Sequence, residues 1–156
     1  MGVAGSGKTH VGRALAARLG WAFFDADDFH PPENIARMSS GVPLSDLDRE
    51  PWLDALVALL QRLDAEGRPA VLACSALRAR FRERLREGAD DVRFVHLEAG
   101  AELLELRLAT RKDHFMPAVL LESQLAALEA PDGELAVDAA LPAEEIVDRV
   151  RAALAV

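Results

Sequence analysis

The chain has 156 residues, 51% of them hydrophobic, and its formal net charge is −8 at pH 7. This length suits a single domain with a sizeable core, and the hydrophobic content excludes disorder as its general state. The negative charge argues against nucleic-acid and anionic-membrane partners. A single cysteine excludes an internal disulfide, so we expect one cytoplasmic domain spanning 1–156.

A phosphate-binding motif stands at the start of the chain. Residues 2–9, GVAGSGKT, match the P-loop pattern G-x-x-x-x-G-K-[ST]. Its glycines let the backbone curl so that N–H groups and the following helix N-terminus face phosphate oxygens. A plain turn before a helix is a poor alternative for so long a motif. The motif predicts ATP and Mg²⁺ as cofactors, with Lys8 on the β- and γ-phosphates and Thr9 on the metal. The expected cofactor-binding residues are Gly2, Val3, Ala4, Gly5, Ser6, Gly7, Lys8 and Thr9.

The motif lacks the strand that normally leads into a P-loop, because only Met1 precedes it. We therefore expect this first strand to be missing or reduced to a stub. In that case, backbone groups of the neighbouring strands would lose their hydrogen-bond partners.

Strands and helices alternate along the rest of the chain. A helix over 8–19 ends at Gly20 and leads into the apolar run 21–24, which is typical of a buried strand. Since strands that alternate with helices form parallel sheets, we expect an α/β fold. The other expected strands are 70–74, 92–97 and 136–138. The other expected helices are 33–40, 48–66 with Asp48 as its cap, 78–87, 101–111, 117–129 and a last one containing Ile146 and Leu154.

Acidic residues follow the first of these strands. Asp25 and Asp27 lie two residues apart, so their side chains share a face in an extended chain. A phosphoryl-transfer site needs one carboxylate near Mg²⁺ and another that accepts the hydroxyl proton. Turn chemistry at a strand end is the alternative, since it also favours Asp. His30, which Pro31 holds extended, could bind a polyol or carboxylate or could simply be exposed.

Arginines follow the second long strand and recur before residue 112. Arg78 and Arg82 lie nearest the strand end and could clamp a substrate carboxylate, whereas a run of charge is more often solvated surface. Arg107 and Arg111 are four residues apart and precede a Phe-Met-Pro break. A mobile lid over the phosphates would have this composition. A helix C-terminus enriched in cations is the alternative.

Several segments together resemble the gluconokinase family of small P-loop kinases. Besides the P-loop they are Asp25–Asn34 (DADDFHPPEN), Met38–Leu53 (MSSGVPLSDLDREPWL), Cys74–Arg82 (CSALRARFR) and Arg111–Glu122 (RKDHFMPAVLLE). The resemblance implies a three-layer P-loop kinase fold with a five-stranded parallel sheet, whose first strand is central, and a helical lid at about 111–117. It further implies a homodimer that transfers the γ-phosphate of ATP to the 6-hydroxyl of D-gluconate, a phosphotransferase with an alcohol acceptor.

The resemblance also implies roles by position. Lys8, Asp27 and Arg111 would be catalytic, with Asp27 as the base and Arg111 on the phosphates. Thr9 and Asp25 would serve the metal, and Arg107 would flank the adenine. The implied substrate contacts are Asp27, His30, Arg49, Ser75, Ala76 and Arg82. The chain departs from the family pattern at Ala26 and Asp113, where glycine is frequent, and at Arg78, where lysine is common.

Three alternatives remain open from the sequence. A related kinase could act on another small acceptor, such as shikimate or a nucleoside monophosphate. A regulatory relative could bind the nucleotide without turnover. The short N-terminus could leave the chain inactive.

Overall fold

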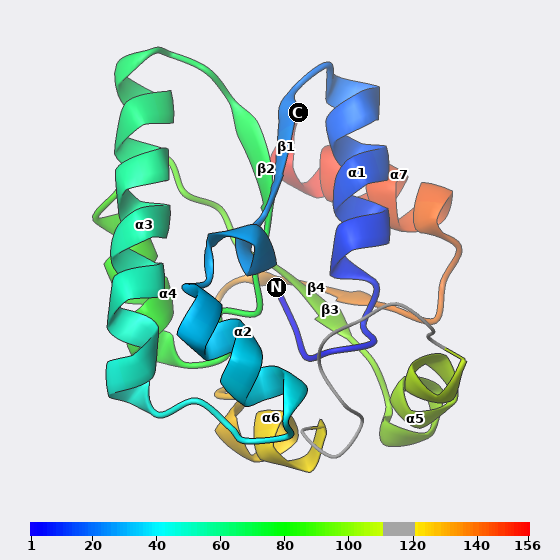
Figure 1. Ribbon diagram of the computed structural model, residues 1–156. Helices are drawn as coiled ribbons and strands as arrows, with labels where there is room; N and C mark the ends of the chain where they lie inside the picture. Colours follow the sequence, from blue (N-terminus) through cyan, green and yellow to red (C-terminus); the bar gives the residue numbers. More distant parts are fainter. Residues whose placement is uncertain (111–120) are drawn as a thin grey trace.

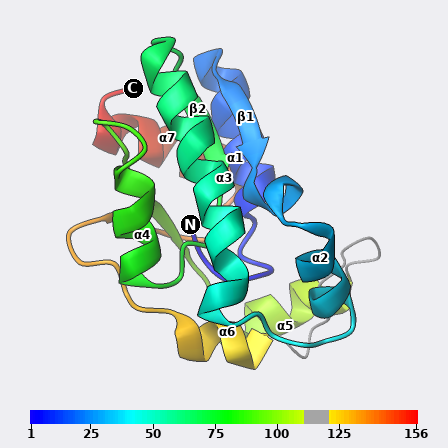
Figure 2. The ribbon, with the colours of Figure 1, turned by 60° about the vertical axis from the view of Figure 1, so that its left-hand side comes forward.

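The computed structural model describes residues 1–110 and 121–156, and it places parallel strands between two groups of helices (Figure 1). Helices α1 and α7 pack together on one side, and α3 and α4 pack together on the other (Figures 1 and 2). This arrangement confirms the expected three-layer α/β fold class. The helices are α1 (Lys8–Leu19), the 3₁₀ helix η1 (Ala26–Phe29), α2 (Pro32–Ser39), α3 (Asp46–Ala65), α4 (Ala79–Arg86), α5 (Ala101–Ala109), α6 (Leu121–Ala127) and α7 (Ala143–Leu154).

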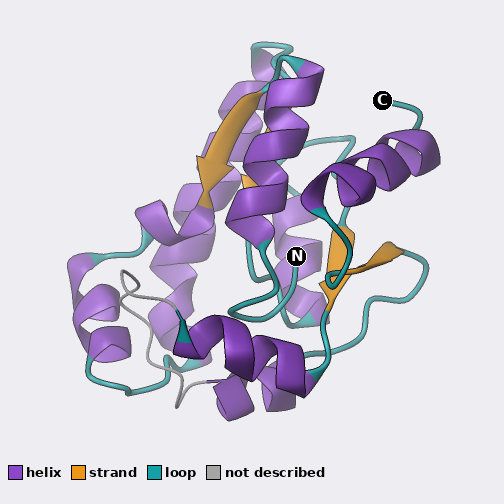
Figure 3. Cartoon of the chain, turned by 90° about the vertical axis from the view of Figure 1, so that its right-hand side faces the viewer, coloured by secondary structure: helices purple, strands orange, loops and turns teal. Residues whose placement is uncertain are grey.

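The strands form two separate parallel pairs. β1 (Ala22–Asp25) pairs with β2 (Ala70–Ala73), and β3 (Val95–Glu98) pairs with β4 (Leu135–Asp138). Figure 3 shows the two pairs apart from each other. The family resemblance implies five strands, whereas the described residues contain four. Each of the four lies within a few residues of its expected position.

The first two residues bridge these pairs. The backbone N–H of Leu97 donates to the Met1 carbonyl at 2.9 Å, and the Met1 amino group donates to the Val95 carbonyl. On the other side, the Gly2 N–H donates to the Ser75 carbonyl at 3.2 Å. Met1 thus takes a strand-like place beside β3, which is the expected stub.

An apolar cavity of about 490 Å³ lies between the two strand pairs. Side chains from both layers and both pairs line it, among them Val11 of α1, Leu63 of α3, Val71 of β2 and Val95 of β3. Some of its lining residues, such as Phe94 and Leu97, belong to the two larger clusters of buried apolar residues.

Local signals in the sequence explain where the helices begin and end. α1 ends at Gly20, whose φ of 68° is the left-handed conformation that glycine adopts readily. The expected cap of α3 was wrong: Ser45 is the N-cap, and Asp48 is the third helical residue. The Ser45 hydroxyl accepts from the Asp48 N–H, while the Asp48 carboxylate accepts from the Ser45 N–H at 2.7 Å. This reciprocal pair is a capping box.

The P-loop lies at the carboxyl ends of the strands. Helices α2, α5 and α6 lie at the same end of the molecule (Figure 1). A small apolar cluster of Val3, Leu77, Leu104 and Leu121 joins the P-loop to α5 and α6. The expected lid at 111–117 lies outside the described residues. No helix in the described ranges is long and apolar enough to cross a membrane.

Candidate active site

The P-loop connects Met1 to α1, and its shape depends on glycine. Gly2, Gly5 and Gly7 have φ values of 142°, 84° and 95°, which strain other residues. A Cβ atom on Gly2 would also lie 2.9 Å from the Leu97 carbonyl oxygen, so a side chain cannot fit there. Gly7 is the N-cap of α1, and its carbonyl accepts from the Val11 N–H at 2.9 Å. The loop therefore presents backbone N–H groups and a helix N-terminus at one place, as anion binding requires.

Polar side chains around this loop form the first part of the site. The Lys8 ammonium donates to the Val3 carbonyl at 3.0 Å, which folds the side chain back over the loop. The Thr9 hydroxyl donates to Asp25 Oδ2 at 2.7 Å, and Asp25 Oδ1 accepts from the Asp27 N–H at 3.2 Å. Asp25 is also the N-cap of η1. One cavity of about 570 Å³ is lined by Lys8, Thr9, Asp25 and Asp27.

These residues fit a magnesium ion shared with a nucleotide. Thr9 and Asp25 offer hard oxygen ligands, which Mg²⁺ prefers, and their hydrogen bond already fixes them side by side. Among residues 1–110 and 121–156, no group of three or more His, Cys, Asp or Glu side chains could hold a metal by itself. A site of few protein ligands suits Mg²⁺, which usually keeps waters and binds phosphate oxygens.

An aromatic wall continues the cavity away from the P-loop. The His30 ring stacks on Trp52 with centroids 4.8 Å apart and an interplanar angle of 8°. The Trp52 indole N–H donates to the Ala26 carbonyl at 2.7 Å, which fixes the pair. Burial lowers the pKa of His30 to about 4, although nearby Asp27 opposes the shift. His30 is therefore neutral at pH 7, and its buried Nδ1 has no hydrogen-bond partner within the described parts of the chain.

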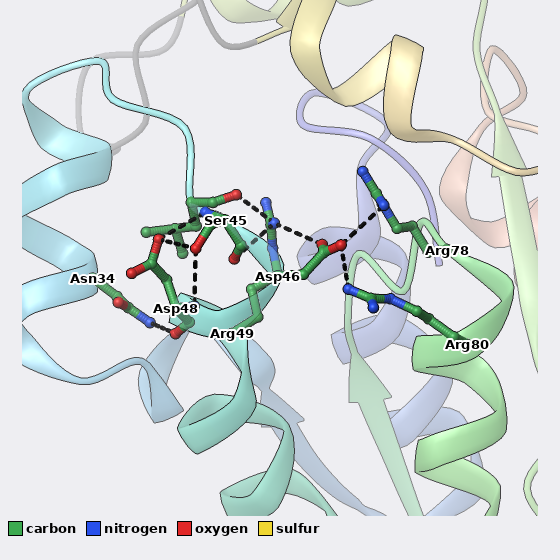
Figure 4. A network of polar contacts seen from close by, with 8 residues as sticks. Asn34, Ser45, Asp46, Asp48, Arg49, Arg78 and Arg80 are labelled. Atoms are coloured by element: carbon green, nitrogen blue, oxygen red, sulfur yellow. Dashed lines mark hydrogen bonds and ion pairs between the residues drawn. The ribbon is translucent and has the colours of Figure 1, made fainter.

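Three arginines form a polar network around the Asp46 carboxylate (Figure 4). The Asp46 carboxylate pairs with Arg78 at 3.0 Å, with Arg49 at 3.8 Å, and with Arg80. Arg49 also donates to the Leu44 carbonyl at 2.6 Å. Burial lowers the pKa of Arg49 from its ordinary value, and Asp46 opposes that shift. Arg49 and Arg78 line the cavity, whereas Arg80 is not among its lining residues.

Most of the expected site residues that the structure describes lie on this cavity. Lining residues from the P-loop are Ala4, Gly5, Gly7, Lys8 and Thr9. The expected residues from other elements that line it are Asp25, Asp27, His30, Arg49, Ser75 and Arg107. Gly2, Val3 and Ser6 belong to the loop but do not line the cavity. The expected Arg111 lies outside the described residues.

Two expected substrate contacts lie elsewhere. Arg82 has an exposed fraction of only 5%, and its guanidinium donates to the carbonyls of Ala76 at 3.0 Å and Leu77 at 3.2 Å. Ala76 is fully buried, with a left-handed φ of 44°. Neither residue lines the cavity. Arg82 instead holds the strained turn after β2, which carries Ser75 and Leu77 into the cavity wall.

Arg107 joins the P-loop to the segment that follows β4. Its guanidinium donates to the carbonyls of Gly5 and Ser6, both at 3.4 Å, and to that of Ala139 at 2.8 Å. Ala139 directly follows β4. Arg107 therefore lies at the P-loop, and its guanidinium N–H groups already donate to backbone carbonyls of the protein.

Three residues in and around the site were missed in the sequence. Gln124 accepts from the Ala4 N–H through Oε1 at 2.6 Å and lines the cavity, but a lone glutamine in a helix gives no signal. Trp52 is the stacking partner of His30, and its helical position indicates only core packing. Asp46 could have been suspected from its place one turn before Arg49, although its link to α4 depends on the tertiary fold.

Comparison with known proteins agrees with this geometry. Residues 1–131 match the protein family described as "AAA domain". A gluconokinase of Gluconobacter oxydans (strain 621H) is 50% identical over 131 aligned residues, which cover 84% of this chain and 74% of that protein. A gluconokinase structure from Sinorhizobium meliloti 1021 superposes with a TM-score of 0.87 at 46% identity, over 99% of this chain and 89% of the other. An unliganded sugar kinase structure from Janibacter sp. HTCC2649 gives a TM-score of 0.92 at 44% identity, over 99% and 91% of the two chains.

Proposed function

Since this chain belongs to the gluconokinase family, we propose that it transfers the γ-phosphate of ATP to the 6-hydroxyl of D-gluconate. The observation that carries this proposal is one cavity lined by the P-loop, by Asp25 and Asp27, and by Arg49 and Arg78 from other elements. A linear sugar acid has the matching chemistry, with a hydroxyl at one end and a carboxylate at the other.

The P-loop end supplies the phosphate chemistry. Backbone N–H groups of the loop and the Lys8 ammonium would neutralise the charge that develops on the transferred phosphoryl group. Thr9 and Asp25 would hold the magnesium ion, which supplies further positive charge beside the phosphates when it is bound. Arg107 would secure the loop through the carbonyls of Gly5 and Ser6. We also propose a contact between Arg107 and the adenine, and one between Arg111 and the phosphates, as the family resemblance implies.

Asp27 is the proposed catalytic base. Its backbone N–H is fixed by Asp25, and its side chain lines the cavity next to Lys8 and Thr9. From this place its carboxylate would accept the proton of the 6-hydroxyl as the oxygen attacks phosphorus, in line with the departing ADP. Orientation of that hydroxyl is the second contribution of Asp27.

The aromatic wall would bind the middle of the sugar chain. His30 is neutral at pH 7 and its Nδ1 is buried, so a sugar hydroxyl is a suitable partner for it. A protonated imidazole would instead compete with the arginines for the carboxylate. The Ser75 segment is the other polar part of the wall, and Arg82 supports it through the neighbouring carbonyls.

Acceptor selectivity tests the proposed function. The purified chain should release ADP from ATP and Mg²⁺ when gluconate is present, and much more slowly with shikimate, a nucleoside monophosphate or no acceptor. Turnover with shikimate or a nucleoside monophosphate alone would contradict the proposed substrate. ATP binding without turnover on any acceptor would contradict the proposal that the chain is a kinase.

We also propose a cytoplasmic homodimer, as the family resemblance implies. The single cysteine, Cys74, is buried and free, which fits a reducing compartment. Light scattering on the purified protein tests the oligomeric state, and a mass of one chain would contradict it.

A further inference from the structure

We propose that Arg78 binds the carboxylate of the acceptor together with Arg49, and that Asp46 is a positioning residue for both guanidinium groups. This inference rests on the proposed function and adds the residues that recognise the acid group. Neither Arg78 nor Asp46 is among the residues to which the family resemblance assigns a role.

The charges of the network leave an excess of positive charge at one end of the cavity. Three guanidinium groups, those of Arg49, Arg78 and Arg80, share the single carboxylate of Asp46, which gives this set a formal charge of +2. The neighbouring Asp48 pairs with Arg37 at 2.7 Å and with Ser45, and it attracts Arg49 only from a greater distance. In a chain of net charge −8, such an excess beside a cavity favours an anionic ligand.

Only two of the three arginines can meet a ligand in this cavity. Arg49 comes from the first turn of α3 and Arg78 is the N-cap of α4, and both line the cavity beside Phe81. The Arg80 Cζ lies over the Phe81 ring, 4.9 Å from its centroid, and half of the Arg80 side chain is exposed. Arg78 and Arg80 thus contact the same Asp46 oxygen but differ in access to the cavity.

The position of this end explains why an acid would be preferred. Asp27, Lys8 and Thr9 line the same cavity from the P-loop side. A linear hydroxy acid with its carboxylate on Arg49 and Arg78 therefore extends its far hydroxyl toward Asp27. A neutral polyol would leave the partly desolvated guanidinium groups without an anionic partner, which disfavours its binding.

Asp46 keeps the guanidinium groups in place before the substrate arrives. Without this carboxylate the three cations would repel one another and lose a common anchor. Its two carboxylate oxygens have different partners: Oδ1 faces Arg49, and Oδ2 faces Arg78 and Arg80 (Figure 4). Asp46 therefore acts through the arginines and does not itself contact the acceptor.

Steady-state kinetics of Arg78→Gln and Arg80→Gln test this assignment. We expect Arg78→Gln to raise the KM for gluconate about 10- to 100-fold, the range for losing a charge-assisted hydrogen bond, with a much smaller change in kcat. The matched control Arg80→Gln should change that KM less than about threefold, because Arg80 is outside the cavity. The KM for ATP should stay the same in both variants, which shows that the nucleotide site is intact.

A double-mutant cycle tests the role of Asp46. Asp46→Asn alone should raise the KM for gluconate about 5- to 10-fold, and it should have a smaller effect in the Arg78→Gln background, where Asp46 has only Arg49 left to position in the cavity. Fully additive effects, or equal KM changes in Arg78→Gln and Arg80→Gln, would overturn the inference. Failure of the unmutated chain to phosphorylate gluconate would instead overturn the proposed function, so the two failures are distinct.

Discussion

The two cavities described above are similar in size but differ in what surrounds them. The cavity between the strand pairs measures about 490 Å³ and the one over the P-loop about 570 Å³. The first is lined mostly by apolar side chains, with valine and leucine the commonest, although a few charged residues also reach it. The second brings together a glycine loop, two aspartates, the neutral His30 and four arginines. Converging polar groups, and not volume, therefore identify the site.

The comparison assigns catalysis to one cavity and stability to the other. Substitutions in the polar cavity should change turnover while the fold persists. Substitutions around the apolar cavity should change the free energy of unfolding while the chemistry persists. The following predictions test this separation in order of expected effect.

The largest effect is expected for Asp27→Asn. The amide keeps the shape of the side chain but cannot accept the hydroxyl proton, so kcat should fall about 10²- to 10⁴-fold. The melting temperature should change far less than kcat, since the two side chains have the same size and shape. Near-normal turnover in this variant would show that Asp27 is not the base.

A smaller but clear effect is expected for Leu63→Ala in the wall of the apolar cavity. Leu63 is 4% exposed, and its removal would enlarge an existing void. We expect a loss of about 2–3 kcal/mol in the free energy of unfolding, measured by urea denaturation. The kcat measured below the unfolding transition should stay within about twofold, and a large fall would contradict the separation.

His30 should make stability depend on pH between about 6.5 and 4. Its pKa in the folded chain is lowered to about 4 by burial, so in this range the unfolded chain binds a proton that the folded chain does not. Above pH 6.5, His30 therefore does not reduce the free energy of unfolding. As the pH drops toward 4, protonation of the unfolded chain lowers that free energy by about 1–2 kcal/mol.

His30→Gln is the matched variant for this effect. Other carboxylates titrate in both proteins, so the quantity to compare is the difference in unfolding free energy between pH 7 and pH 4.5. The unmutated chain should lose more stability than the variant across this interval. An equal loss in both would contradict the buried, neutral state of the ring.

The smallest effect is expected for Val71→Ile, which adds one methylene toward the apolar cavity. Filling this space should raise the free energy of unfolding by up to about 0.8 kcal/mol. The rate of gluconate phosphorylation should not change. A loss of stability would show that the wall at Val71 leaves no room for the added group.

The sequence predicted well those features that depend on neighbouring residues. The P-loop, the helix that ends at Gly20 and the four strands depend on local patterns, and the structure agrees with them. The cap of α3 was predicted wrongly as Asp48, because Ser45 and Asp48 are both good caps. Their reciprocal hydrogen bonds decide in favour of Ser45.

Features that depend on tertiary contacts were harder to predict. Arg78 and Arg82 are four residues apart in the sequence, but Arg82 donates to the buried turn at Ala76, whereas Arg78 lines the cavity. Gln124 reaches the P-loop from a helix more than a hundred residues away. No pattern along the chain separates such residues from solvated surface.

The central claim is that the acceptor lies with its carboxylate on the arginines and its far hydroxyl at Asp27. Proton-coupled phosphorus NMR of the product made from ATP and gluconate tests this orientation directly. We expect a phosphate monoester signal that is split by the two protons of a CH₂ group, because this orientation places the terminal hydroxyl at the transferred phosphate. A signal split by a single proton, from a secondary hydroxyl, would contradict this orientation, as would inorganic phosphate as the sole new product beside ADP.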